Sequence, residues 1–177
     1  MYTLRSMITL NNAVVLCKEE SDKWLTARSY REFSARDFKF VTKLRIPSES
    51  SRKLAFIRST IEHLPKEGQA LLFVTAWGIW PSSESEHLFH RVRMSIGLPL
   101  SRLADTPGHI INLKDFDLIE CLLYVCLLNY WDILFADEHH CWAISFSHDE
   151  YIYLGCNDGV LHSNFKSASK TFDENVS

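Results

Sequence analysis

The stretch from Asp115 to Phe165 contains no lysine and no arginine over 51 residues. It holds nine acidic side chains, at Asp115, Asp117, Glu120, Asp132, Asp137, Glu138, Asp149, Glu150 and Asp158. Residues 1–114 have the opposite balance, with 17 basic and 11 acidic side chains. A field of one sign attracts partners of the opposite sign and repels polyanions such as nucleic acid. The charge distribution therefore favours a basic protein partner and argues against a nucleic-acid partner.

Disulfide and membrane signatures are also missing. There is no CxxC motif, and the five cysteines are an odd number that lie mostly in apolar runs. This usage is typical of reduced, buried thiols in a cytosolic protein. The longest strongly apolar run, from Cys121 to Trp131, is 11 residues, too short to span a bilayer. The N-terminus lacks a signal-peptide pattern. We therefore expect a cytoplasmic protein with no membrane partner.

The sequence contains no motif that is diagnostic of an enzymatic reaction. The chain has no GxSxG, P-loop or GxGxxG sequence, and its six glycines leave little for a loop that cradles phosphate. We therefore expect no cofactor, no bound metal and no enzymatic activity.

Hydrophobic residues are nevertheless abundant, at 46% of the chain, which is enough for a real core. Length and composition predict one domain over residues 1–160. The turn signal Asn157-Asp158-Gly159 precedes a Ser/Lys/Asn-rich segment, so we expect a flexible tail over 161–177.

Apolar spacing predicts the first elements. Residues 13–17 form a strand, and residues 24–46 fit neither helical nor strand periodicity. A helix follows Pro47, because Leu54, Ile57, Ile61 and Leu64 share one face. Residues 70–80 form a central strand. Ser83 and Glu86 make a capping box for a helix that runs to about Ile96, with Gly97 as its left-handed cap.

The second half predicts a buried helix and a meander. Residues 98–111 are the longest irregular connection, and Asn112 caps a helix that is apolar all round beyond Glu120. Strands follow at 131–136, 141–147 and 151–154, separated by polar turns. The order predicts an α+β fold: a small, mostly antiparallel sheet with helices packed on one face and a C-terminal three-strand meander.

Histidines suggest weaker alternatives. His87 and His90 share a helical face near Glu84 and Glu86, and could supply two metal ligands, although no third ligand has a defined spacing. His148 with Asp149 and Glu150 has the composition of an acid–base site, but in a hairpin tip it is a solvated turn.

Three segments carry a resemblance: Trp77-Gly78-Ile79-Trp80-Pro81, Pro107-Gly108-His109 and Ser147-His148-Asp149-Glu150. Over residues 70–155 the chain looks like a small bacterial family of uncharacterised α+β proteins, which implies a fold but no activity. In overall character it is also similar to immunity proteins of polymorphic toxin and contact-dependent growth inhibition systems, which are small, acidic, single-domain α+β proteins. This second likeness concerns overall character only, so it assigns no role to any individual residue.

We therefore expect an immunity protein that occludes the basic cleft of a cognate toxin, a nuclease. Acids that rim aromatic residues suit capture of a basic protein, although turns of a meander that alternate ends would separate the two acidic pairs. The expected contacts are Asp137, Glu138, Asp149 and Glu150, with Tyr151 and Tyr153 as anchors. The alternatives are a metal-dependent enzyme that uses His87 and His90, and a non-catalytic structural or regulatory adaptor.

Overall fold

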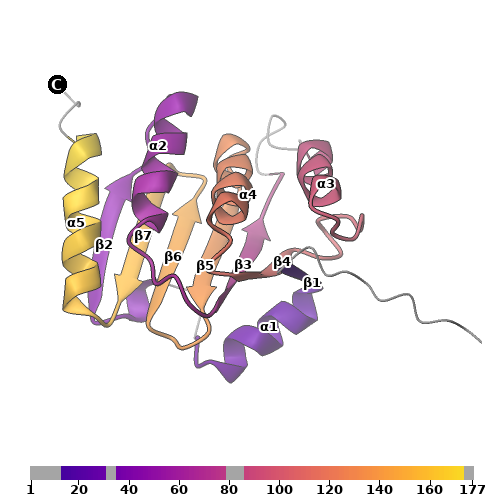
Figure 1. The fold of residues 1–177 in the computed structure, drawn as a ribbon, viewed down its shortest axis with the longest axis horizontal. Coiled ribbons are helices and arrows are strands. Elements are labelled where there is room, and N and C mark those ends of the chain that lie inside the picture. The colour runs from indigo at the N-terminus through magenta and orange to yellow at the C-terminus, as the bar shows by residue number, and fades with distance from the viewer. Residues whose placement is uncertain (1–12, 31–34, 79–85, 174–177) are drawn as a thin grey trace, which may run out of the picture.

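Seven strands form one open antiparallel sheet in the order β1-β4-β3-β5-β6-β7-β2 (Figure 1). The computed structural model describes residues 13–30, 35–78 and 86–173. The strands are β1 (Ala13–Leu16), β2 (Phe40–Arg45), β3 (Gln69–Ala76), β4 (Gly108–Asn112), β5 (Asp132–Asp137), β6 (Trp142–Ser147) and β7 (Tyr151–Cys156). The α+β class, the antiparallel sheet and the β5-β6-β7 meander confirm the prediction.

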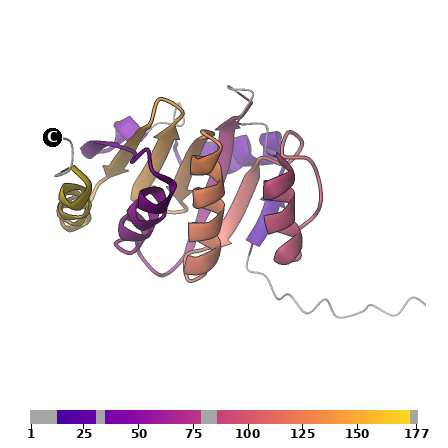
Figure 2. The ribbon, with the colours of Figure 1, turned by 90° about the horizontal axis from the view of Figure 1, so that it is seen from above.

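Helices cover the two faces of the sheet unequally. The front face carries α2 (Ser50–Ile61), α3 (Glu86–Ser95), α4 (Phe116–Leu128) and α5 (Gly159–Asp173). The back face carries α1 (Lys18–Ala27) and the short 3-10 helix η1 (Ala35–Asp37), and Figure 2 shows α1 on the side opposite the other helices. The front layer matches the predicted helical layer, and the back layer is an addition to it.

The front core follows from strand alternation. Ile133 and Phe135 of β5, and Trp142, Ile144 and Phe146 of β6, all point to the front face and join the main core. Helix α4 supplies Ile119, Leu122, Leu123, Val125, Cys126 and Leu127, all buried, which confirms it as a largely buried helix. Among the described residues, no helix combines the length and apolar character needed to cross a membrane.

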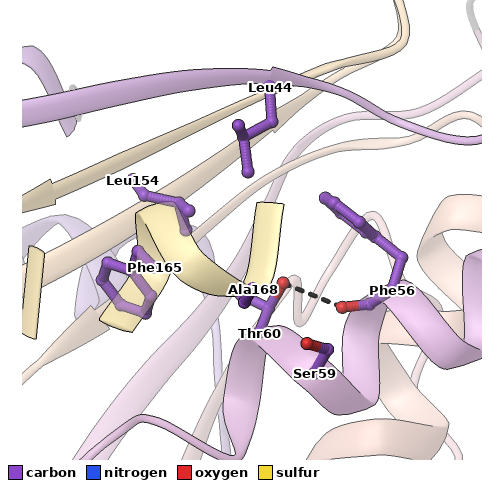
Figure 3. Close-up of a pocket in the computed structure, with 7 residues that line it drawn as sticks. All are labelled: Leu44, Phe56, Ser59, Thr60, Leu154, Phe165 and Ala168. Carbon is purple, nitrogen blue, oxygen red and sulfur yellow. Dashed lines mark hydrogen bonds between the residues drawn. The ribbon is translucent and has the colours of Figure 1, made fainter. Parts of the chain in front are cut away.

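Residues Gly159–Asp173 form the helix α5, in the segment for which the sequence predicted a flexible tail from residue 161. Asp158 caps α5, because its carboxylate accepts hydrogen bonds from the amides of Val160 (2.7 Å) and Leu161 (2.8 Å). Phe165 is 1% exposed and packs with Leu44, Leu154 and Phe56 between α5, α2 and the sheet (Figure 3). This junction has no room for a water-sized molecule, so it is core packing.

Three other expectations need correction. Helix α1 begins at Lys18, directly after the first strand, where the sequence predicted no helix. Strand β4 occupies the end of the predicted loop 98–111. Asp115, not Asn112, is the N-cap residue of α4, and Asn112 ends β4. The predicted capping box at Ser83 lies outside the described residues, while Gly97 has the expected positive φ of 71°.

The back layer packs closely because two glycines lie beneath it. A Cβ atom at Gly108 of β4 would collide with the hydroxyl of Ser21 in α1. A Cβ atom at Gly155 of β7 would collide with the carbonyl oxygen of Ala35 in η1. Trp24, Leu25, Tyr30 and Phe38 then bury Leu71, Phe73, Leu134, Ala136 and Ala143 of the sheet. The back layer therefore has its own small core.

Candidate functional site

An open hollow of about 280 Å3 lies on the back face, near the end of the sheet that carries the β6–β7 turn. We call it the back-face hollow. Its lining residues are Ala35, Arg36, Thr75, Asp132, Ile133, Leu134, Ser145, Phe146, Ser147 and Tyr153. The back layer buries the sheet toward the opposite end, where Tyr30 contacts Asp137. The hollow is therefore the part of the back face that η1 borders but does not fill.

Strand register brings polar side chains together in two rows across the back face. The first row runs from β2 to β5 through Lys43, Tyr153, Ser145 and Leu134. The second row runs from β2 to β6 through Arg45, Tyr151 and Ser147. Directly opposed residues have Cβ atoms about 5 Å apart, so each row is a set of contacting neighbours.

Thr75 lies on the back face near the end of β3, at a β-bulge. The pairing of β3 with β5 shifts between Val74 and Ala76, which leaves Thr75 as the extra residue. Val74 is buried in the front core, whereas Thr75 is exposed and lines the hollow. Strand alternation places Thr75 on the same face as Leu71 and Phe73, so its hydroxyl is added to the hollow.

Asp132 and His148 form a tightly bonded pair at the edge of the hollow. Asp132 Oδ1 accepts a hydrogen bond from the backbone amide of His148 at 2.6 Å. The Nδ1 atom of His148 lies 2.9 Å from Oδ1 and 3.0 Å from Oδ2 of Asp132. Its Nε2 atom lies 3.5 Å from Oδ1 of Asp149. Both carboxylates thus face one imidazole, which fixes the β6–β7 turn to β5.

Two cations lie on the predicted tyrosine anchors. The Lys43 ammonium is 3.7 Å from the centre of the Tyr151 ring, and the Arg36 guanidinium is 4.6 Å from that of Tyr153. Hydrogen bonding from Arg36, and then from Lys43, lowers the pKa of the Tyr153 phenol from its ordinary value. The tyrosines therefore lie on a basic flank, not within the acid-rimmed surface expected from the sequence.

The acidic pair at the β5–β6 turn, Asp137 and Glu138, makes hydrogen bonds within the fold. Asp137 is 4% exposed, and its Oδ1 accepts hydrogen bonds from the Tyr30 hydroxyl and the amides of Cys141 and Trp142. Glu138 accepts a hydrogen bond at 2.7 Å from the amide of Gln69. Asp137 is therefore unsuited to the partner contact predicted for it, because its carboxylate is buried and hydrogen-bonded to Tyr30 of the back layer and to the backbone after the β5–β6 turn.

The acidic pair at the β6–β7 turn is more accessible. The Asp149 side chain is 73% exposed, and its backbone amide donates to the hydroxyl of Ser147 at 3.3 Å. Glu150 is 29% exposed and forms an ion pair of 3.6 Å with Arg45. The two turns join antiparallel strands in succession, so the two acidic pairs lie at opposite ends of the sheet, as their positions in a meander predicted.

The histidines of the metal alternative lie apart from the hollow on α3. His87 is exposed, and His90 Nε2 lies 3.4 Å from Oε1 of Glu86. Within residues 13–30, 35–78 and 86–173, no three His, Cys, Asp or Glu side chains form a group suited to a metal ion. Glu84, one of the acids considered with them, lies outside the described residues.

Sequence reasoning missed most of the hollow. The polar lining residues it missed are Arg36, Thr75, Asp132, Ser145 and Ser147, and it also missed Lys43, which lies beside the hollow next to Tyr153. One signal was available for the serines, because alternation that sends Ile144 and Phe146 to the core sends Ser145 and Ser147 to the opposite face. The same alternation sends Thr75 to the face of Leu71 and Phe73, whereas Arg36 depends on η1, which has no comparable sequence signature.

Comparisons with protein families, with curated proteins and with solved structures found no match. The resemblance to an uncharacterised bacterial family and the likeness to immunity proteins therefore remain predictions. The function of the chain has to be inferred from its own geometry and charge.

Proposed function

We propose that this chain is a cytoplasmic immunity protein of a bacterial toxin system, such as contact-dependent growth inhibition, and that it neutralises a basic toxin by binding it. The proposed interface comprises the β6–β7 turn and the adjoining back-face hollow. The observation that carries this proposal is the exposed acidic turn beside an uncovered, polar strip of sheet. A nuclease is the toxin class that fits best, because its cleft is basic in order to hold phosphate.

Charge at the β6–β7 turn supports a basic partner. Asp149 is the most exposed acid there, while Asp132 and Glu150 lie close by in partly exposed positions. Exposed charges of this kind accelerate encounter and orient the partner more than they add to final affinity. The acidic turn would therefore steer a basic cleft onto this end of the sheet.

The open shape of the back-face hollow is more typical of a protein-binding surface than of a deep active site. The hollow is open and Tyr153 lines it, while Tyr151 lies directly opposite the lining residue Ser147; both tyrosines are half-buried. Tyrosines are enriched among the residues that dominate interface energy, because they bury a large rigid ring and retain a polar tip. A loop of the toxin could insert into the hollow while the acidic turn contacts its cleft.

The test begins with tagged chain as bait in an extract of its native host, at low and then high salt. We expect one basic protein to be retained at low salt, to be toxic when expressed alone, and to lose its toxicity when co-expressed with this chain. Absence of such a protein would contradict the proposal.

Charge reversal then locates the interface. Asp149→Lys should weaken binding about tenfold and flatten its salt dependence, because it removes an exposed steering charge. Glu67→Lys is the matched control, since Glu67 is an exposed acid just before β3, at the opposite end of the sheet. The affinity of each variant for the retained protein would be measured by titration calorimetry. Equal effects of the two reversals would place the interface elsewhere.

A further inference from the structure

Two cations converge on one tyrosine at the wall of the back-face hollow. The Arg36 guanidinium lies 4.6 Å from the centre of the Tyr153 ring, and the Lys43 ammonium lies 5.6 Å from the same point. Lys43 is on β2 and Arg36 is on η1, so they approach Tyr153 from different elements. Lys43 lies beside the hollow as the direct neighbour of Tyr153 on the paired strand, and its ammonium is 3.7 Å from the centre of the Tyr151 ring. Positive charge is thus gathered where the hollow begins.

Hydrogen-bond donors continue from this point along the sheet. Ser145 lies directly opposite Tyr153, and its oxygen accepts a hydrogen bond from the amide of Ala35 at 3.3 Å. The Ser147 oxygen similarly accepts from the amide of Asp149. Because a hydroxyl carries one hydrogen as well as its acceptor sites, both serines keep a hydrogen to donate to a ligand.

Among the described residues, one carboxylate lines the hollow, that of Asp132, and it is already hydrogen-bonded. Asp132 accepts hydrogen bonds from the backbone amide of His148 and faces the ring of the same residue. The other polar side chains of the lining, within the part of the chain that the structure describes, are Arg36, Thr75, Ser145, Ser147 and Tyr153, all of which can donate. A hollow with a surplus of donors and of positive charge at one end matches a ligand rich in acceptors.

We infer that the back-face hollow binds a phosphate monoester, with the phosphate group held by Arg36, Lys43, Tyr153 and Ser145. A phosphate monoester carries close to two negative charges and three terminal oxygens, which suits two cations and two hydroxyl donors. A carboxylate offers one charge and two oxygens. The donors come from side chains on β2, β6, β7 and η1, so the site needs no glycine-rich loop.

The rest of the ligand is a small hydroxylated group. The hollow extends from Tyr153 past Leu134 toward Ser147, Thr75 and Asp132, and its volume of about 280 Å3 exceeds that of a phosphate group. Hydroxyls of the ligand would meet Thr75 and Ser147, while its carbon skeleton would lie on Leu134. A sugar phosphate has this combination of groups.

The experiment uses the full chain without any partner, so it succeeds or fails independently of the immunity proposal. Ribose 5-phosphate, inorganic phosphate and ribose are each titrated into isotope-labelled protein in a phosphate-free buffer, and amide shifts are followed by NMR. We expect ribose 5-phosphate to bind with a Kd of about 1 mM or below, inorganic phosphate to bind more weakly, and ribose not to bind detectably. The shifts should concentrate at Arg36, Lys43, Ser145 and Tyr153.

Substitutions at the exposed Lys43 and at the half-buried Tyr153 test the assignment, and both lie outside the hydrophobic cores' fully buried residues. Lys43→Gln and Tyr153→Phe should each weaken binding of ribose 5-phosphate at least about fivefold, because each removes one donor to the phosphate. Arg45→Gln is the matched control: it removes the same charge from the same face of β2, at a residue that pairs with Glu150. The affinity of the Arg45→Gln variant for ribose 5-phosphate should change less than twofold. The proposal is overturned if ribose 5-phosphate causes no shifts at these residues, or if Arg45→Gln weakens binding as much as Lys43→Gln.

Discussion

Arg93 is fully buried on α3 and binds the loop that follows this helix. Its guanidinium donates hydrogen bonds to the Ser101 carbonyl (2.8 Å), the Thr106 hydroxyl (3.0 Å), the Thr106 carbonyl, and Nε2 of His109 (3.0 Å). Burial lowers the pKa of Arg93 to about 10. Burial, with Arg93 beside it, also lowers the pKa of His109 to about 3. His109 is thus a neutral acceptor that orders a connection expected to be irregular.

The neutral state of His109 makes the free energy of unfolding depend on pH. The folded chain keeps His109 neutral down to a pKa of about 3, whereas the unfolded chain protonates it near 6.5. The contribution of neutral His109 to the free energy of unfolding is therefore fully present above pH 6.5. It is lost as the pH falls toward 3, by up to ~1.4 kcal/mol per pH unit. His109→Gln retains an acceptor for Arg93 but does not titrate, so urea unfolding should show a shallower decline in this window.

The exposed His87 provides the comparison for this pH experiment. His87→Gln removes a histidine from the same region without touching Arg93, so its pH profile should follow that of the wild-type chain. If His109→Gln also follows the wild-type profile, the neutral state of His109 is not the source of the pH dependence.

Elements of the back layer decide the shape of the hollow. Helix η1 lies directly on β7, and Gly155 permits this approach because it has no side chain. Gly155→Ala would drive a methyl group into the Ala35 carbonyl and the Phe38 ring, so the free energy of unfolding should fall by ~1–3 kcal/mol. Gly159→Ala is the control, because its nearest contact, with Phe40, is at 3.9 Å. Equal losses in thermal or urea unfolding would show that η1 is not held by this contact.

Helices and strands with a regular apolar period could be predicted from the sequence. Those that begin at residues unusual for that position could not. Periodicity identified α2, α4 and the meander. The turn signal Asp158-Gly159 proved to be the N-cap of α5. Helix α1 has Cys17 as its N-cap, and the thiol of Cys17 and the carboxylate of Glu20 form a capping box that serine or threonine normally makes. Strand β4 begins at Gly108, a residue that usually signals a loop but here accommodates Ser21.

At the scale of the whole molecule, the acidic stretch of the sequence does not become an acidic face. Folding brings Arg58 to Glu120 at 2.8 Å and Arg45 to Glu150 at 3.6 Å, while Asp137 is buried and Asp158 caps α5. Sequence position could not reveal these pairings, because both arginines come from the basic half of the chain. At the β6–β7 turn, Asp149 stays exposed beside a basic flank formed by Lys43 of β2 and Arg36 of η1. The candidate interface is therefore smaller and more mixed in charge than the sequence predicted.

The most direct test of the central proposal is hydrogen–deuterium exchange of this chain, alone and in complex with its captured toxin. An interface at the β6–β7 turn and the back-face hollow predicts slower exchange at residues 147–151 and 35–45 in the complex. It also predicts little change at residues 138–141, which lie at the opposite end of the sheet. Protection of residues 138–141 or of α3, with no change at 147–151, would contradict the proposed interface.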